Sequence, residues 1–253
     1  MLYKNLTLTH QLALDFCCSE DAVSDRYNHF TNYQPLPGRR RFERTERDCF
    51  LKIAVYGGKL LVTGREDIVS ELERRYWNTG GAWFFEYPTM RELDGLFHEY
   101  GYTLHTMHPF YIADKKSELP DDPGRDYTCV RYEAVEIEQF RGDERFDEAF
   151  AFSPCAPDVL AYAAVRKSDG AILGMAGASA DSPFLWQIGI NVIPEARGRG
   201  VACDLVARLK NEILDLGYLP YYGMSVSHTA SQNVALNAGF RPAWVELITE
   251  KLP

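Results

Sequence analysis

Cysteines paired as Cys-x-x-Cys are missing from this sequence, so no cysteine has the spacing of a metal site or a redox motif. The six cysteines stand at positions 17, 18, 49, 129, 155 and 203, and no Cys-x-x-Cys pair occurs among them. Structural zinc sites and disulfide-exchange motifs depend on such pairs. We therefore expect no bound metal and mostly buried free thiols, as in a protein of the reducing cytoplasm.

Long apolar runs and an excess of positive charge are also missing. No stretch is apolar over the length that a membrane-spanning helix needs, and the first residues lack the apolar run and cleavage site of a leader peptide. Lysine and arginine number 27 against 36 aspartate and glutamate, which gives a formal net charge of −9. Nucleic-acid-binding proteins usually present a basic surface. We expect neither a nucleic-acid nor a membrane partner, and a monomer or a homodimer.

A composition break near the middle of the chain indicates two domains. Residues 117–126 are charged and contain two prolines and a glycine, which is typical of a linker. We predict an N-terminal α/β accessory domain at 1–116 and a second domain at 127–253, both of ordinary size. The apolar share of 46% is enough for packed cores.

The N-terminal half alternates predicted helices and strands. Two β-rich runs flank Gly57-Gly58, which predicts a hairpin over 50–63. Thr89 and Glu92 have the spacing of a capping box, so a helix is expected to start there. The other expected elements are a helical region over 6–30, a helix over 66–78, a strand over 82–85 and an extended segment over 102–107. The basic run 39–47 is interpreted as a solvated loop or hairpin, with a phosphate or carboxylate contact as the alternative.

The C-terminal half has a clearer order of elements. Strands are expected over 127–134, 160–166, 171–180, 184–193, 219–226 and 240–249, and helices over 136–150, 200–216 and 229–238. One βα unit among antiparallel hairpins favours an α/β sheet of mixed strand direction.

The strongest motif lies between the strand expected at 184–193 and the helix that follows it. Arg197-Gly198-Arg199-Gly200-Val201-Ala202 places glycines and arginines at a helix start. Backbone N–H groups and the helix dipole favour a phosphate there, and glycine lets the phosphate approach closely.

Three phosphate loops compete for this segment. A dinucleotide loop needs a third glycine where Cys203 stands, and a P-loop needs a Lys-Ser/Thr pair that is absent. The third loop, Arg/Gln-x-x-Gly-x-Gly/Ala, binds the pyrophosphate of coenzyme A, and Arg197, Gly200 and Ala202 fill it. A chance glycine-rich helix start in an unrelated α/β domain remains as the alternative.

With its setting, this segment resembles the GNAT family, the Gcn5-related N-acetyltransferases. Residues 192–202 look like the strand-to-helix segment of that family, and 230–240 look like its last helix, which ends in Gly239-Phe240. The resemblance covers residues 127–250. It implies a mostly antiparallel GNAT-type sheet flanked by helices.

The resemblance also implies roles for individual residues. The backbone of the motif strand would bind the pantetheine arm like an added strand, and the arginine side chains would add charge-assisted bonds to the pyrophosphate. The implied cofactor-binding residues are Val192, Ile193, Arg197, Gly198, Arg199, Gly200, Val201, Ala202, Ser231 and Asn233.

The implied activity is transfer of an acetyl group from acetyl-CoA to a primary amine of a small molecule or a peptide by direct attack. The family often carries a tyrosine as general acid where this chain has Ala235. Replacement candidates are His228, Tyr222 and Ser227, with a helix cap as the alternative role of His228. A catalytically silent acyl-CoA-binding sensor is the alternative function.

The general base is not apparent from the motif. Gln187 and Asn191 on the motif strand cannot serve as bases, whereas Asp181, Glu246 and Glu133 qualify only if the fold brings them to the cleft. The N-terminal half is interpreted as a degenerate copy of the GNAT fold or as a separate cap over the acceptor site.

Overall fold

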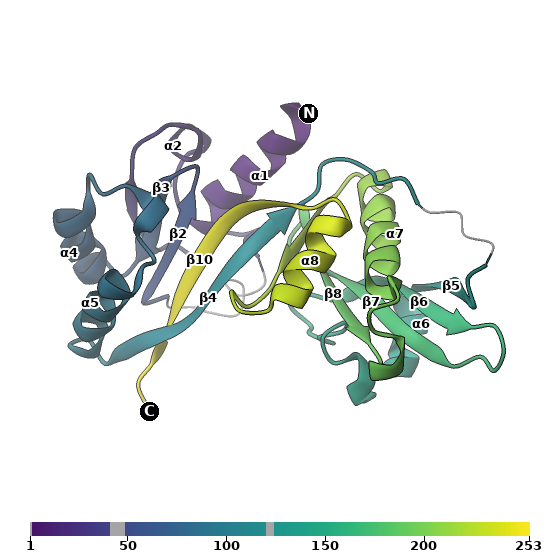
Figure 1. The fold of residues 1–253 in the computed structure, drawn as a ribbon. Coiled ribbons are helices and arrows are strands. Elements are labelled where there is room, and N and C mark those ends of the chain that lie inside the picture. Colours follow the sequence, from purple (N-terminus) through teal and green to yellow (C-terminus); the bar gives the residue numbers. More distant parts are fainter. Residues whose placement is uncertain (1, 41–48, 120–123) are drawn as a thin grey trace. The chain divides into compact units, whose positions relative to one another are not determined.

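The computed structural model describes residues 2–40, 49–119 and 124–253, and its contacts divide the chain into two compact units. The C-terminal unit consists of Tyr111–Gly223 and His228–Arg241. The N-terminal unit consists of Leu2–Phe110, Met224–Ser227 and Pro242–Pro253. Figure 1 shows both units along the chain.

The sheet of the N-terminal unit has the strand order β1-β3-β2-β10-β4. Its strands are β1 (His29–Asn32), β2 (Leu51–Tyr56), β3 (Lys59–Gly64), β4 (Tyr102–Ile112) and β10 (Arg241–Lys251). β2 and β3 form the predicted hairpin, and both turn glycines, Gly57 and Gly58, have the positive φ that this turn requires. The last strand of the chain, β10, pairs antiparallel with β2 in this unit.

Helices cover both faces of this sheet. The helices are α1 (Leu2–Asp15), α2 (Glu20–Ser24), α4 (Glu66–Tyr76) and α5 (Tyr87–His98). α4 and α5 bury Leu72, Leu93 and Phe97 in one core cluster with Ile53 of β2. The preceding residue of β2, Lys52, points to the opposite face. Its ammonium lies 4.4 Å from the ring centroid of Phe16, which follows α1.

Three local predictions in this unit are wrong. The expected helical region 6–30 divides into α1, α2 and β1, because Cys17 takes a positive φ of 52° that ends the first helix. Residues 82–85 form no strand: a 3-10 turn, η1 (Gly81–Trp83), starts where Gly81 donates to the carbonyl of Gly58. The capping box is also wrong, because α5 begins two residues early with Glu86 as its N-cap and Pro88 in its first turn.

The basic run begins with two buried arginines, contrary to the solvated loop expected there. The guanidinium of Arg40 is 1% exposed and pairs with Asp15 and with Glu246, the latter at 2.6 Å. These contacts of Arg40 agree with the alternative prediction for the basic run, a carboxylate contact. Residues 41–47 of the run lie outside the described residues.

The sheet of the C-terminal unit has the order β9-β8-β7-β6-β5 and matches the mixed, mostly antiparallel sheet that was predicted. Its strands are β5 (Tyr127–Glu133), β6 (Asp158–Arg166), β7 (Ile172–Ala180), β8 (Leu185–Val192) and β9 (Leu219–Gly223). Only the pair β8–β9 is parallel; the pairs from β5 to β8 are antiparallel.

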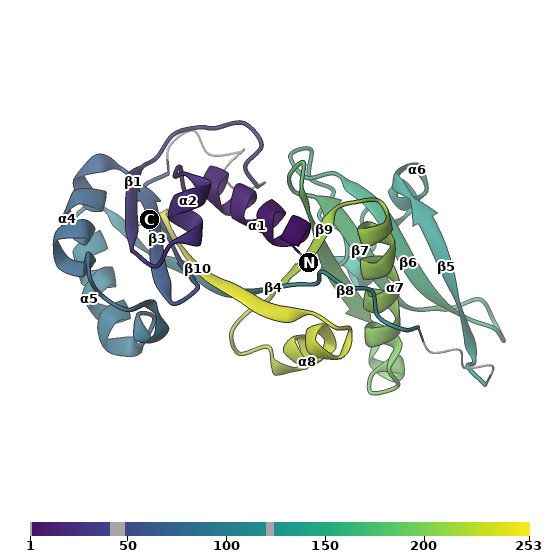
Figure 2. The same ribbon diagram turned by 90° about the horizontal axis from the view of Figure 1, so that it is seen from above.

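Two layers flank this sheet, as Figure 2 shows from above. The long helix α7 (Val201–Asp215) covers β6, β7 and β8 on one face, and α8 (Thr229–Asn237) packs beside it. The opposite face carries α6 (Ala134–Ile137) and two 3-10 turns, η2 (Glu138–Phe140) and η3 (Glu144–Phe146). The predicted helix over 136–150 is thus broken, because Gly142 turns the chain with a φ of +83° between η2 and η3. Phe140, Phe146 and Phe150 then insert separately into the core against β6 and β7.

The start of the predicted linker is fixed to the C-terminal unit. Ser117 exchanges two backbone bonds with the Asn211 side chain, at 2.9 and 2.8 Å, and its hydroxyl donates to the carbonyl of Ala238. The ammonium of the buried Lys210 donates to both the Ser117 hydroxyl and the Ala238 carbonyl. Contacts thus place the border near residue 110, and domains at 1–116 and 127–253 stay a prediction.

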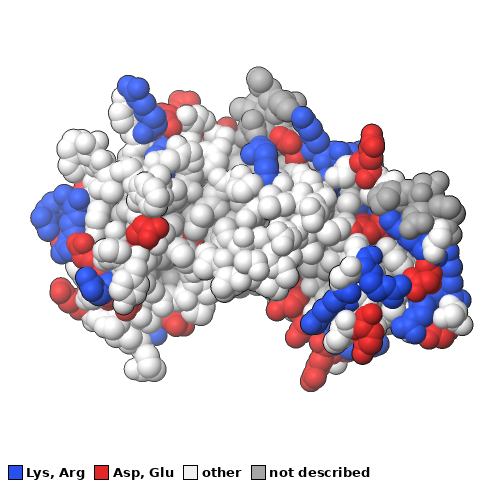
Figure 3. Space-filling model, viewed as in Figure 1, with Lys and Arg blue, Asp and Glu red and all other residues white. Residues whose placement is uncertain are grey.

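Charges of both signs lie interspersed on the face in Figure 3, above all where β5 and β6 lie. Several are paired there, including Arg131 with Glu212 at 2.6 Å and Arg166 with Asp169 at 2.9 Å. Among the described residues, no helix has both the length and the apolar character needed to cross a membrane.

Candidate active site

The site is built where the parallel strands β8 and β9 part. Their pairing ends with Gln187 opposite Tyr221, whereas β8 continues to Val192 in register with β7 on its other side. The edge of β8 beyond Gln187 therefore has no pairing with β9. Unpaired strand edges accept an extended ligand as an added strand.

The loop after β8 leaves room for an anion at the start of α7. Gly198 and Gly200 have positive φ values of +73° and +79°, and a Cβ on either would meet no atom within 4 Å. Gly200 is the N-cap of α7, and its carbonyl accepts from Asp204 in the first helical turn. The first N–H groups of a helix have no partner within it, so those of α7 are available to an anion.

The backbone of the predicted pantetheine residues is partly engaged within the protein. The Val192 carbonyl accepts from Nε of Arg197 at 3.1 Å, and both backbone groups of Ile193 are bonded, to Leu173 and to Ala196. Since a carbonyl has a second lone pair, Val192 keeps one acceptor position. Ile193 offers its side chain to the cavity.

A cavity of about 550 Å³ lies beside the open edge of β8. Seven predicted site residues line it: Val192 of β8, Ile193 and Arg197 of the loop, Ala202 of α7, Tyr222 of β9, His228 at the start of α8 and Ser231 within it. The fold thus brings one loop and two distant segments of the sequence to the same cavity.

Tyr222 provides a hydroxyl in this cavity. Its side chain is 2% exposed, its ring packs edge-on against Phe240 at 5.9 Å, and its hydroxyl lies 2.9 Å from Oγ of Ser231. Burial raises the pKa of Tyr222 above its ordinary value, and the charge of Glu148 acts in the same direction. The phenol is therefore protonated at neutral pH and able to donate a proton.

His228, Ser227 and Asn233 occupy different surroundings. His228 is the N-cap residue of α8 but makes no side-chain cap hydrogen bond, and its exposed ring lines the cavity. Ser227 belongs to the segment Met224–Ser227 of the other unit, where its hydroxyl lies 3.1 Å from Ser225. Asn233 is exposed on α8 and is not among the described residues that line the cavity. The roles of Ser227 and Asn233 stay predictions.

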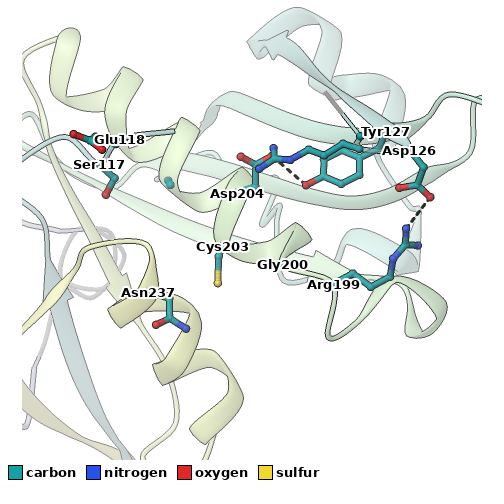
Figure 4. Close-up of a pocket in the computed structure, with 12 residues that line it drawn as sticks. Ser117, Glu118, Asp126, Tyr127, Arg199, Gly200, Cys203, Asp204 and Asn237 are labelled. Carbon is teal, nitrogen blue, oxygen red and sulfur yellow. Dashed lines mark hydrogen bonds and ion pairs between the residues drawn. The ribbon is translucent and has the colours of Figure 1, made fainter. Parts of the chain in front are cut away.

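A second cavity, of about 640 Å³, lies on the other flank of α7, and Figure 4 shows its lining. Arg199 and Gly200 line this cavity, where Arg199 pairs with Asp126 at 2.7 Å. Cys203 points into it from α7 and Asn237 from α8. The loop therefore divides its predicted residues between two cavities.

A buried carboxylate, Asp204, fixes the strand start beside this second cavity. It accepts from Arg125 at 2.5 Å, Tyr127 at 3.2 Å and Cys129 at 3.3 Å. Burial opposes its charge, but bonds from Arg125 and Cys129 hold the pKa of Asp204 below its usual range. Burial and the Asp204 charge raise the pKa of Cys129 to about 11, so this thiol is not a nucleophile at neutral pH.

The sequence analysis missed Glu148 as a cavity residue, and it missed the structural role of Asn191. Oδ1 of Asn191 accepts from the backbone N–H groups of Glu148 and Ala149 at 3.0 and 2.7 Å, and Nδ2 donates to Asp147 at 3.0 Å. A Cβ on Gly189 would lie 1.9 Å from the Glu148 carbonyl oxygen, so only glycine permits this contact. A glycine inside a strand signals such a close approach, and Gly189 was the available signal.

Comparison with known proteins assigns this region to a family. Residues 127–240, a little under half of the chain, match the sequence profile of the acetyltransferase (GNAT) family. These residues form a GNAT acetyltransferase domain. The domain contains the open edge of β8, the glycine loop and Tyr222. A search of curated proteins finds no match to this chain.

Several solved structures resemble the chain at low identity. A GNAT acetyltransferase of Novosphingobium aromaticivorans is 22% identical over 60% of this chain and 69% of its own, with a TM-score of 0.44. A GCN5-related N-acetyltransferase-like protein of Streptococcus suis is 16% identical over 64% and 68%, with a TM-score of 0.45. A tandem GNAT protein from the clavulanic acid pathway is 16% identical over 73% and 67%, with a TM-score of 0.47. The family assignment rests on the sequence profile.

The GNAT domain has no hydroxyl at Ala235, which is fully buried in α8. The hydroxyl in the cavity comes instead from Tyr222 on β9. Tyr222 was one of the three candidates from the sequence, and its role as the acid stays a prediction.

None of the three carboxylates considered as bases lines the cavity of the GNAT domain among the described residues. Asp181 is fully buried and accepts from Ser179 at 2.7 Å and from Tyr221. Glu246 is a buried partner of Arg40 in the N-terminal unit, and Glu133 is the N-cap of α6. In the described part of the chain, no group of three or more His, Cys, Asp or Glu side chains has a geometry suited to a metal.

Proposed function

We propose that this chain is an N-acetyltransferase that moves an acetyl group from acetyl-CoA to a primary amine of a small molecule or a peptide. One observation carries the proposal: the unpaired edge of β8, Arg197 and Ala202 on either side of the glycine turn, and the Tyr222 hydroxyl meet at one cavity. The residues fit coenzyme A, since a Cβ on Gly198 or Gly200 would occupy open space.

The residues around the cavity divide the work of the reaction. The N–H groups at the start of α7 and Arg197 bind the pyrophosphate, and the β8 edge orients the extended arm. Bound acetyl-CoA supplies the acetyl group as a thioester. Tyr222, held by Ser231 at 2.9 Å, donates a proton toward the leaving sulfur. The exposed ring of His228 at the mouth of the cavity contacts the acceptor.

A location in the cytoplasm accompanies this proposal. The six cysteines, all among the described residues, are free, and two of them are adjacent at Cys17 and Cys18. Thiols persist in a reducing compartment. We propose further that the chain acts as a monomer or a homodimer.

A silent acyl-CoA-binding sensor is the second candidate function. The buried Ala235, which has no hydroxyl, favours it. The sensor shares the coenzyme A site with the enzyme but needs no proton donor. The Tyr222 hydroxyl favours the enzyme over the sensor.

A thiol-release assay separates the two functions. The full chain is mixed with acetyl-CoA and a panel of alkylamines, polyamines and lysyl peptides, and free thiol and acetylated amine are measured. The enzyme gives amine-dependent thiol with an equal amount of acetylated amine. The sensor gives a rise in melting temperature with acetyl-CoA but no product. If neither signal occurs, both functions are refuted.

A further inference from the structure

The segment after η3 places one carboxylate against β8 on the cavity side. Glu148 lines the cavity with Tyr222 and His228, and its exposed side chain makes no hydrogen bond or ion pair with the described residues. The neighbouring Asp147 accepts from Asn191. Glu148 is therefore the carboxylate of this pair that remains available to a ligand.

The backbone of Glu148 is fixed to β8 by two independent contacts. Its N–H donates to Oδ1 of Asn191 at 3.0 Å, and its carbonyl oxygen occupies the space that a side chain at Gly189 would take. A second glycine, Gly177 on β7, makes the same room for the carbonyl of Ala149. The segment 147–150 is thus held at a defined distance from the edge where β8 and β9 part.

We infer that Glu148 is the general base for the acceptor amine and that Asn191 is its positioning residue. The inference rests on the proposed N-acetyltransferase function. It assigns the role of general base to a residue that lines the same cavity as the proposed acid, Tyr222.

The proton and electron balance of the step closes with these two groups. The amine nitrogen forms the new bond to the acetyl carbon, and the carbon–sulfur bond breaks with its electron pair on sulfur. The cationic amine first loses one proton to the Glu148 carboxylate, which passes it to water. After attack the second amine proton leaves the nitrogen for Glu148, and the proton of Tyr222 goes to the leaving thiolate. Exchange with water at the open cavity restores both groups.

Other charged groups face the same cavity. Glu144, Arg145 and Asp147 come from the η3 segment, Arg197 from the loop, and Tyr222 and His228 from the β9–α8 side. Arg145 pairs with Asp143 at 2.6 Å. The wall around Glu148 thus carries an excess of negative charge, which favours a cationic amine in its protonated form.

The test compares Glu148→Gln with the wild-type chain in the thiol-release assay, on the amine of the panel with the highest rate. Removing a general base lowers the rate by about 10²-fold or more. Added formate restores part of the rate to Glu148→Ala, because it supplies a carboxylate in the space of the missing side chain. Glu138→Gln is the matched control, because Glu138 is exposed on the same layer and bonded to Arg141 at 2.8 Å. This control keeps the wild-type rate.

The positioning role of Asn191 has its own readout. Asn191→Ala lowers kcat, and added formate does not restore the rate, because the base is displaced and not removed. In the double variant with Glu148→Gln, Asn191→Ala has little further effect, since both act through one group.

Three outcomes decide the inference. A Glu148→Gln variant with near wild-type kcat, or a Glu148→Ala variant whose rate formate does not raise, refutes Glu148 as base and leaves the acetyltransferase standing. A wild-type chain without amine-dependent product refutes the proposed function and the base together. Binding of acetyl-CoA by Glu148→Gln, measured by its melting temperature, shows that the variant is folded.

Discussion

The hydroxyl groups of Tyr222 and Ser231 lie 2.9 Å apart in the cavity, and only the tyrosine is acidic enough to serve a leaving thiolate. Ser231 orients the phenol, and burial keeps its proton in place by raising the pKa of Tyr222. At the scale of single residues, the proposed enzyme and the alternative sensor differ in whether this pair supplies a proton.

Tyr222→Phe removes the acid and keeps the ring that packs on Phe240. We expect kcat to fall by about 10²-fold with acetyl-CoA affinity unchanged, because the hydroxyl acts on the leaving group. Steady-state kinetics and calorimetric titration measure the two quantities. Tyr162→Phe is the control, since the Tyr162 hydroxyl is bonded to Glu212 at 2.6 Å and does not line the cavity. Equal kcat in both variants would show that Tyr222 is not the acid.

Lys210 gives a prediction for stability against pH. Burial lowers the pKa of Lys210 from 10.5 to about 8, whereas an unfolded lysine keeps its ordinary value. Between these values the unfolded chain binds more protons, so the contribution of Lys210 to stability rises with pH, and below pH 8 it is constant.

Lys210→Met lacks this dependence. Urea unfolding at pH 7.5 and pH 9.5 should therefore show a gain for the wild type that the variant does not share. Lys116→Met is the control, because Lys116 is half exposed and pairs with Asp215, and it should behave like the wild type. A Lys210→Met variant with the wild-type gain contradicts the assignment.

The sequence named Tyr222 and His228 as candidate site residues but did not name Glu148. The first two follow the motif strand in a segment whose position is fixed by the family pattern. Glu148 reaches β8 only through the long-range bonds of Asn191 and the space left at Gly189. Contacts between residues some forty positions apart leave little trace in the local pattern.

At the scale of elements, the sequence predicted β8, the glycine loop and α7 well. It did not predict the short turns α6, η2 and η3 on the opposite face of the sheet. β8 and α7 occupy Leu185–Val192 and Val201–Asp215, close to the expected 184–193 and 200–216, because their apolar periodicity is local. The expected helix over 136–150 does not form. Gly142 separates the turns η2 and η3, and three phenylalanines pack separately into the core against β6 and β7.

The glycine turn at the start of α7 can be tested by one substitution. Gly200→Ala puts a side chain at a φ of +79° and into the space of the pyrophosphate. We expect a loss of about 1–2 kcal/mol of stability together with much weaker acetyl-CoA binding. Gly170→Ala has the same strain, at a φ of +77°, in the hairpin between β6 and β7. It should lose similar stability with unchanged binding, and equal binding losses in the two variants would contradict the site.

The close approach at Gly189 gives a second prediction for the elements. Gly189→Ala brings a methyl group to 1.9 Å from the Glu148 carbonyl, so the segment 147–150 must move. We expect a loss of about 1–3 kcal/mol and a kcat as low as that of Asn191→Ala. Gly95→Ala, in the exposed middle of α5 with no atom within 4 Å, should instead gain about 0.4–1 kcal/mol. Denaturant unfolding measures both, and opposite signs are the expected result.

At the scale of the whole molecule, the two units differ in what they offer. The C-terminal unit contains all of the GNAT domain except Met224–Ser227, and both cavities that its loop lines. The N-terminal unit buries its charges in pairs, such as Arg40 with Glu246. Its predicted role as an accessory domain stays a prediction.

Hydrogen exchange of the full chain with and without acetyl-CoA tests which unit binds the donor. We expect protection over 188–202 and 228–234, where the open strand edge, the glycine turn and the start of α8 lie, and little change over 50–100. Protection of β2 and β3 with none in β8 would overturn the placement of the donor site.

The position of β10 has a consequence for the order in which the protein is made. This strand, Arg241–Lys251, pairs with β2 although almost two hundred residues separate the two. On the ribosome, the sheet that begins first must wait for the last strand to emerge, while the GNAT domain has already been synthesised between its two parts. A chain that ends near residue 240 would contain every strand of the C-terminal sheet, whereas its N-terminal sheet would lack the strand between β2 and β4.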